Sequence, residues 1–351
     1  MSAVADSPPL AGLRPLSLGE LLDQIIRVCR KDFSTLAGIV AVALVPLTLA
    51  QVGSTLLAQD ALLAAETFDS VMSSTFLFAG INILMSILGL VLVQGLAAAA
   101  VARAVADRYI GEPAGILGTL RKLSGSWLRI GVLVVLLLLS GFGLLLWAFV
   151  PCIGWVSGFG MFVFLFAALW PLAIPAAVIE GKTPWEALRR AWDLARSRFW
   201  WVTGFVFVLW LFAQLVITGP SILIGLGLQF VSGSPLEDYN TRLIVQSIIS
   251  LVGSLVYLPI YLTGMTLLYL DLRVRGEGLD LRLMAQEARD ETLSATGVLA
   301  GAPQPTSAGL LTWTEFGYFV IITVETVGLV VSLYMFLIAL GLAFAGAAFG
   351  T

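Results

Sequence analysis

Long runs of apolar residues constrain the fold of this chain more than any other feature. Seven of them follow one another, each with about the 20 residues that an α-helix needs to cross the hydrocarbon core of a bilayer. They lie at residues 34–57, 76–105, 128–150, 155–179, 200–231, 243–270 and 316–350. Of the whole chain 59% is hydrophobic and 12% is charged, so a soluble fold would lack the polar groups to cover its surface. We predict an all-α, polytopic transmembrane helical bundle with seven crossings.

The composition excludes several kinds of catalytic and metal site. The sequence has no histidine, which removes Ser-His-Asp and Cys-His nucleophiles and histidine-ligated zinc, iron or haem within this chain. Two cysteines, Cys29 and Cys152, are too few for a thiolate zinc cage or an iron–sulfur cluster. We expect no cofactor and no metal. An enzyme is the least favoured class, because an acid–base pair would have to come from carboxylates that resemble surface ion pairs.

The basic residues predict the orientation in the membrane. Short cytoplasmic loops carry an excess of Lys and Arg, and of the 19 basic residues here all but Arg242 fall on one side of the predicted spans. The N-terminus and the even-numbered connections are therefore expected in the cytoplasm, and the C-terminus outside by parity. The opposite loops carry acidic residues, namely Asp60, Glu66, Asp69, Glu237 and Asp238.

Three similar segments precede the first, third and fifth spans. They cover residues 19–33, 111–127 and 181–199, and each ends in an aromatic residue at the start of its span. Residues 11, 7 and 4 positions before that aromatic form an apolar helix face, namely Leu22, Ile26 and Cys29, then Ile116, Leu120 and Leu123, then Leu188, Trp192 and Ala195. A helix with such a face and with basic residues opposite suits the headgroup layer of a membrane. We predict three repeats, each an interfacial helix followed by two crossings.

These elements predict a domain organisation. Residues 1–15 form a flexible N-terminus, and residues 16–285 form a six-span membrane domain with three interfacial helices. A segment rich in Gly, Pro and Ser follows and predicts a flexible linker over residues 286–312. The seventh transmembrane helix, residues 313–351, is then an appendage.

Three motifs carry a resemblance to a known family. They are RPLSLGELLD at residues 14–23, EALRRAW at 186–192 and LYLDLRVRGEGLDL at 268–281. Together they resemble the membrane-domain family found fused to some bacterial glycerophosphoryl diester phosphodiesterases. The resemblance implies an integral protein of the bacterial plasma (inner) membrane with no catalytic residues to carry over, because the family's soluble barrel needs catalytic histidines and roughly 250 residues. The seventh span departs from the family pattern.

The polar end of the sixth span is a candidate contact for lipid headgroups or for a partner protein. It carries Asp271, Arg273, Arg275 and Glu277, and guanidinium groups can hold phosphate in a bidentate manner. The alternative is a membrane-exit cap with local ion pairs. The third interfacial segment adds Arg189 and Arg190 to this candidate contact, while its other polar residues, Glu180 among them, are predicted to form a solvated helix face.

The seventh span carries its own polar and small residues. Glu325 lies about nine residues inside it, where a carboxylate costs roughly 2.5 kcal/mol or more. It is predicted to be an ion or proton site, a polar contact with another subunit, or a group hydrogen-bonded to neighbouring helices. A stripe of small residues, Ala339, Ala343 and Ala347, permits close helix packing, either within this bundle or on another protein.

The sequence favours a non-catalytic membrane protein, either a lipid-interacting scaffold or a subunit that docks into a membrane complex. The expected partners are anionic lipid headgroups at the cytoplasmic face and a protein that contacts the seventh helix. Nucleic acid is not expected, since the bilayer edge explains each basic cluster. The alternative is a transporter or lipid-translocating protein, suggested by the repeats and by prolines within spans. Against it stands the lack of charged residues deep in the six-span core.

Overall fold

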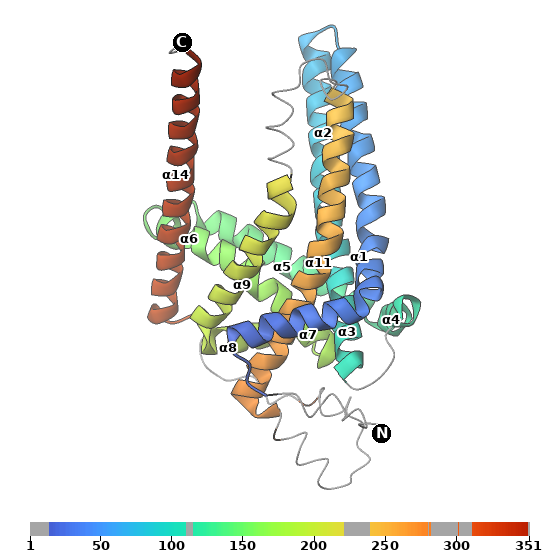
Figure 1. Ribbon diagram of the computed structural model, residues 1–351, viewed down its shortest axis with the longest axis vertical. Helices are drawn as coiled ribbons and strands as arrows, with labels where there is room; N and C mark the ends of the chain where they lie inside the picture. The colour runs from blue at the N-terminus through green and yellow to red at the C-terminus, as the bar shows by residue number, and fades with distance from the viewer. Residues whose placement is uncertain are drawn as a thin grey trace. The chain divides into compact units, whose positions relative to one another are not determined.

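The computed structural model describes residues 14–109, 115–220, 239–279, 281, 301 and 311–349. Every regular element in this part of the chain is helical (Figure 1). Seven of the described helical stretches are long and apolar enough to cross a membrane, at Leu18–Leu63, Phe68–Arg108, Ile116–Trp147, Ile153–Ile179, Phe199–Thr218, Asn240–Glu277 and Trp313–Ser332. The predicted all-α bundle with seven membrane-competent helices is confirmed, and the chain is an integral, multi-pass membrane protein.

Several of these stretches contain more than one element. The α-helices are α1 (Leu18–Leu63), α2 (Phe68–Gly89), α3 (Ala98–Tyr109), α4 (Ile116–Leu123), α5 (Trp127–Trp147), α6 (Ile153–Phe164), α7 (Trp170–Ile179), α8 (Pro184–Ser197), α9 (Phe199–Ala213), α11 (Tyr239–Glu277) and α14 (Trp313–Phe349). Wider π-helical turns extend or join them at η2 (Leu90–Ala97), η4 (Leu165–Leu169) and η5 (Gln214–Thr218), and a 3-10 turn, η3 (Ser124–Ser126), joins α4 to α5.

The chain forms two compact units. One comprises residues 1–136 and 170–305, and the other comprises residues 137–169 and 306–351. We call them the main unit and the small unit. The end of α5 and all of α6 group with α14 in the small unit. The predicted division into residues 1–15, 16–285, 286–312 and 313–351 stays a prediction.

The first predicted interfacial segment is a helix set off from the span that follows it. Ser17 begins it with a capping box, since its side chain accepts from the Glu20 amide while the Glu20 carboxylate accepts from the Ser17 amide. Asp32 leaves the helical conformation, with φ −120° and ψ 23°. In Figure 1 the segment before this bend runs across one end of the main unit, and the rest of α1 turns away from it. Asp32 forms an ion pair with Arg108 at 3.0 Å.

The other two predicted segments also contain a helix. The third is α8, which starts with a capping box between Thr183 and Glu186. Hydrogen bonds from the Thr183 backbone and side chain lower the pKa of Glu186. The second is the short helix α4, and residues 111–114 before it lie outside the described residues. That these helices lie in the headgroup layer stays a prediction.

In each of the three predicted interfacial helices, only some residues of the predicted apolar face are buried in the protein. In the segment of α1 before the bend the buried residues are Leu21, Ile25 and Cys29, whereas Ile26 is 59% exposed. In α8 the predicted Trp192 and Ala195 are buried, and in α4 only Leu123 of the predicted three is buried. The face that packs is therefore rotated from the predicted one, because α11 covers one side of the α1 segment, as the position of Ile25 beside Gly264 shows.

Helix α11 lies at the centre of the main unit and packs against α1, α3, α7 and α8. Alanines make this close packing possible. Ala98, Ala102 and Ala106 of α3, spaced by four residues, are buried. Cys29 is buried with its Sγ 3.7 Å from the Pro259 carbonyl oxygen, Cys152 is exposed, and both cysteines are free.

The small unit is built around the contact between α6 and α14. The Gly160 amide donates to the Thr323 hydroxyl at 2.8 Å, and the Phe164 and Phe319 rings meet edge to face with centroids 5.7 Å apart. A Cβ on Gly160 would lie 2.1 Å from the Phe319 carbonyl oxygen. Only glycine therefore allows the two helices to approach this closely.

Candidate functional site

Five polar residues form a cluster inside the main unit, where α7 ends and α8 and α11 meet. Helix α11 supplies Tyr269, Arg273 and Glu277, which are spaced by four residues and so share one face of the helix. Glu180 follows the last residue of α7, and Arg190 comes from α8. We call these five residues the buried charge cluster.

The Glu180 carboxylate joins the cluster together through one oxygen. Its Oε1 lies 3.2 Å from Nε of Arg190 and 3.3 Å from Nε of Arg273, and it accepts a hydrogen bond from the Tyr269 hydroxyl. The Glu277 carboxylate accepts from the Arg190 guanidinium and lies 3.5 Å from Nε of Arg273. Each arginine therefore contacts both carboxylates.

The cluster is neutral by charge count and shielded from solvent. It has two guanidinium groups and two carboxylates, and none of these four side chains is more than 8% exposed. The cost of burying each charge is offset by its neighbours and by further hydrogen bonds, such as the 3.0 Å bond from Arg273 to the Gly301 carbonyl oxygen. Burial alone would lower the pKa of Arg190, but the charge of Glu180 and its other neighbours outweighs it, so this pKa is raised.

A second group on α11 holds the start of α1. The Asp271 carboxylate accepts from the Leu16 amide at 2.9 Å and from Nε of Arg275 at 2.7 Å. The Arg275 guanidinium in turn donates to the Leu16 carbonyl oxygen and lies over the Trp201 ring, 5.5 Å from its centroid. Both backbone polar groups of Leu16 are thus bound by side chains of α11. We call this group the N-terminal clasp.

Substitution Asp271→Ala is expected to release the start of α1. A hydrogen bond to a charged group contributes about 1.5–3 kcal/mol, so amide hydrogen exchange at Leu16 and in the first turn of α1 should accelerate by roughly ten- to a hundredfold. Asp271→Asn keeps one acceptor oxygen for the Leu16 amide and should show a smaller change. Unchanged exchange in Asp271→Ala would mean that the clasp does not hold this segment.

A third ion-paired group joins α3 to α4 in the main unit. Asp107 is buried and lies 2.8 Å from both Nε of Arg103 and Nζ of Lys122. By contrast, the basic residues in the segment of α1 before the bend are exposed, namely Arg27, Arg30 and Lys31. No ion pair to these three is found within the described part of the chain.

The predicted contact residues therefore fall into two sets. Arg190, Arg273 and Glu277 belong to the buried charge cluster, and Asp271 and Arg275 form the N-terminal clasp. Arg189 is half-buried on α8 and belongs to neither set. The structure favours the alternative of local ion pairs for most of these residues, while their contact with lipid headgroups stays untested.

Sequence reasoning missed two members of the buried charge cluster. Glu180 was predicted on a solvated face, but its side chain is 0% exposed because α8 and α11 close over it. Tyr269 was not singled out at all. Its position four residues before Arg273 is the signal that could have placed it on the same face.

In the small unit, Glu325 is exposed on α14, away from the buried face that includes Phe319, Ile322 and Thr323. Ala339 is exposed as well. The side chains of Ala343 and Ala347 lie outside the described residues, so the predicted stripe and the role of Glu325 stay predictions.

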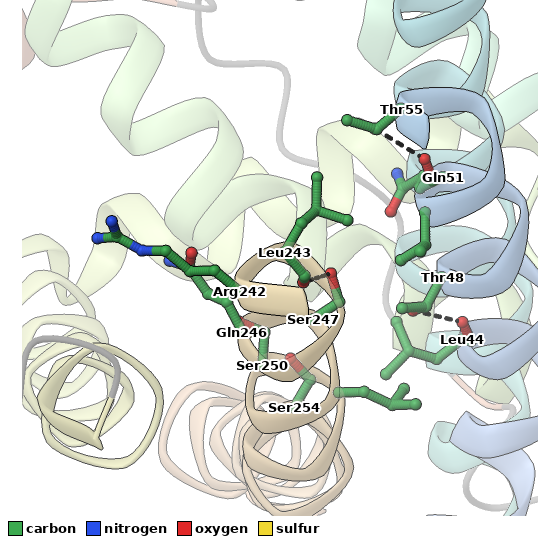
Figure 2. Close-up of a pocket in the computed structure, with 12 residues that line it drawn as sticks. Leu44, Thr48, Gln51, Thr55, Arg242, Leu243, Gln246, Ser247, Ser250 and Ser254 are labelled. Carbon is green, nitrogen blue, oxygen red and sulfur yellow. Dashed lines mark hydrogen bonds between the residues drawn. The ribbon is translucent and has the colours of Figure 1, made fainter. Parts of the chain in front are cut away.

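A cavity of about 640 Å³, lined by both polar and apolar side chains, lies between α1 and α11, away from the buried charge cluster (Figure 2). Helix α1 contributes Leu44, Thr48, Gln51, Val52 and Thr55, and α11 contributes Arg242, Leu243, Gln246, Ser247, Ser250, Leu251 and Ser254. No sequence pattern was taken to predict this cavity, although Gln246, Ser250 and Ser254 recur every four residues along the sixth span. Among the described residues, no group of three His, Cys, Asp or Glu could hold a metal ion.

Comparison with known proteins does not assign a family. No family model, curated protein or solved structure matches the chain. The resemblance to the membrane domain of the bacterial phosphodiesterases therefore stays a prediction. The function has to be argued from the geometry of the described residues.

Proposed function

We propose that the chain is a non-catalytic membrane scaffold that binds anionic lipid headgroups through the segment of α1 before its bend. The proposal takes this end of the main unit as cytoplasmic, as the excess of basic residues predicts. One observation carries it. Ile26, 59% exposed, lies on this segment beside the exposed cations Arg27, Arg30 and Lys31.

The arrangement suits the boundary between headgroups and acyl chains. An exposed isoleucine gains by entering the apolar layer, and cations beside it then lie at the level of the lipid phosphates. The opposite face of the segment, with Leu21 and Ile25, is buried in the protein, and the clasp holds its first residues. The segment is therefore fixed in place before any lipid binds, which reduces the entropic cost of binding.

The ion pairs support a headgroup site on α1 rather than on α11. A guanidinium that already contacts two buried carboxylates, as Arg273 does, would have to give up those contacts to bind phosphate. The exposed cations of α1 have no such cost. The proposed contact with headgroups thus moves from the end of the sixth span to the segment before the first.

The test is the affinity for phosphatidylglycerol of the triple variant Arg27→Gln, Arg30→Gln and Lys31→Gln. Each basic residue near an anionic surface contributes about 1 kcal/mol, so the loss of all three should lower the affinity by roughly a hundredfold. Native mass spectrometry of the purified full chain, titrated with phosphatidylglycerol and with phosphatidylcholine, measures it. Arg242→Gln, which removes a cation at the other end of α11, is the control. Equal retention of phosphatidylglycerol by wild type and triple variant would refute the proposal.

Transport of a solute or lipid is a second candidate function, and the cavity between α1 and α11 favours it. A bundle that only anchors lipid has no need of a cavity of this size, with hydroxyl and amide groups in its lining, within its spans. Docking of a partner protein through α14 has no comparable support from the described contacts.

A further inference from the structure

We propose that the cavity between α1 and α11 is a water-filled vestibule that binds a small, uncharged solute bearing hydroxyl or amide groups. This inference does not depend on the proposed headgroup binding, since the residues involved are different. It rests on the depth of the cavity, on the chemistry of its lining and on the distribution of charge around it.

The cavity reaches well into the membrane-spanning part of the bundle. Leu44, at its deep end, lies twelve residues beyond the bend at Asp32 (44 minus 32), which is about 18 Å along the helix. Thr55, at its other end, lies eleven residues further along α1 (55 minus 44). Since the hydrocarbon core is about 30 Å thick, the cavity extends from near the bilayer centre to the surface opposite the buried charge cluster.

The lining offers hydrogen-bonding groups that the protein leaves available. The hydroxyls of Thr48, Thr55 and Ser247 donate to carbonyl oxygens of their own helices at 2.8–2.9 Å, which leaves their lone pairs as acceptors. The side-chain amides of Gln51 and Gln246 have no hydrogen-bond partner among the described residues. An amide without a partner in an apolar medium costs roughly 2–7 kcal/mol, so these groups favour water or a polar ligand over lipid chains.

The size of the cavity suits both occupants. Water occupies about 30 Å³ in the liquid, so 640 Å³ holds on the order of twenty molecules or one solute of polyol size. Four of the described lining residues, such as Leu44 and Leu251, are apolar and can cover the carbon atoms of such a solute.

The charges favour an uncharged solute over an ion. Among the described residues that line the cavity none is acidic, so a cation in its deep part would find no counter-charge there. The one basic residue in the described lining, Arg242, lies at the end of the cavity away from Leu44, and its guanidinium extends away from α1 (Figure 2). The same end of α1 and the start of α2 carry the exposed carboxylates of Asp60 and Asp69, which repel anions. In the part of the cavity nearest Leu44, the groups that can bind a solute are therefore hydroxyls and side-chain amides.

The proposal is tested with single cysteines introduced on two sides of α11. The full chain is used, reconstituted in liposomes, and it carries Cys152→Ser so that the exposed native cysteine does not react. Ser250→Cys and Ser254→Cys place a thiol in the cavity. Ile248→Cys and Val252→Cys are matched controls, since those residues are exposed on the far side of the helix, about 200° around from Ser250. Only a thiolate in water reacts with a charged methanethiosulfonate reagent. We expect the cavity thiols to react at least about tenfold faster than the controls, with reagents of either charge.

Protection by probe solutes then identifies the class of ligand. Xylitol should slow the labelling of Ser250→Cys severalfold, whereas sodium sulfate and choline chloride at equal osmolality should not. If Ser250→Cys is labelled no faster than Val252→Cys, the cavity is not a water-filled vestibule. Protection by sulfate or choline instead of xylitol, or by none of the three, would refute the proposal that the cavity binds an uncharged solute. None of these outcomes depends on the binding of phosphatidylglycerol by Arg27, Arg30 and Lys31.

Discussion

The variant Arg273→Met is expected to be strongly destabilised. Arg273 is fully buried and contacts both Glu180 and Glu277, so its loss leaves two carboxylates that share the single charge of Arg190. Removing one partner from a buried ion-paired group costs about 3–5 kcal/mol, which is a large part of the stability of an ordinary domain. Methionine keeps the length and the apolar stem of the side chain, so the change tests charge rather than volume. The loss of stability is measured by heating the purified protein to a series of temperatures. Size-exclusion chromatography then gives the fraction that remains folded after each heating step.

A second substitution distinguishes charge imbalance from general damage. Glu180→Gln in the Arg273→Met background restores a neutral cluster and should recover part of the lost stability, so the double variant should unfold at a higher temperature than Arg273→Met alone. Arg30→Met, at an exposed position, serves as the matched control and should unfold close to wild type. If Arg273→Met unfolds at the same temperature as Arg30→Met, the buried charge cluster does not stabilise the fold.

Gly160→Ala is expected to separate α6 from α14 in the small unit. The added Cβ would lie 2.1 Å from the Phe319 carbonyl oxygen and 2.8 Å from the Thr323 hydroxyl oxygen. The first of these atoms belongs to backbone and cannot rotate away, so the helices have to move apart. Overpacking of this kind costs about 1–3 kcal/mol or more. Loss of the hydrogen bond from Gly160 to Thr323 should then raise amide hydrogen exchange in the part of α14 around Phe319.

Gly143→Ala in α5 is the control for this change. It lies in the same unit, and a Cβ there would meet nothing within 4 Å. Because alanine favours helix over glycine, this variant should be as stable as wild type or slightly more so. Equal exchange around Phe319 in Gly160→Ala and Gly143→Ala would contradict the close contact between α6 and α14.

The sequence determined the features that depend on neighbouring residues along the chain. Apolar runs of about 20 residues predict the seven spans, because a helix is the only structure that satisfies the backbone of a single segment in lipid. The capping box that begins α8 follows from Thr183 and Glu186 three residues apart, since its hydrogen bonds are local. The segment before the first span was predicted to be a separate helix, and the bend at Asp32 separates it from the rest of α1.

Only the tertiary structure decided which residues meet. Glu180 and Tyr269 lie 89 positions apart, and whether their side chains touch depends on how α7 and α11 pack. The same holds for the face of α1 that is buried, which α11 selects, and for the grouping of α6 with α14, which depends on a glycine at position 160. Charge and hydropathy along the chain indicate that a residue is polar. They do not indicate whether it finds its partner in another helix, in a lipid headgroup or in water, because that choice depends on distances set by packing.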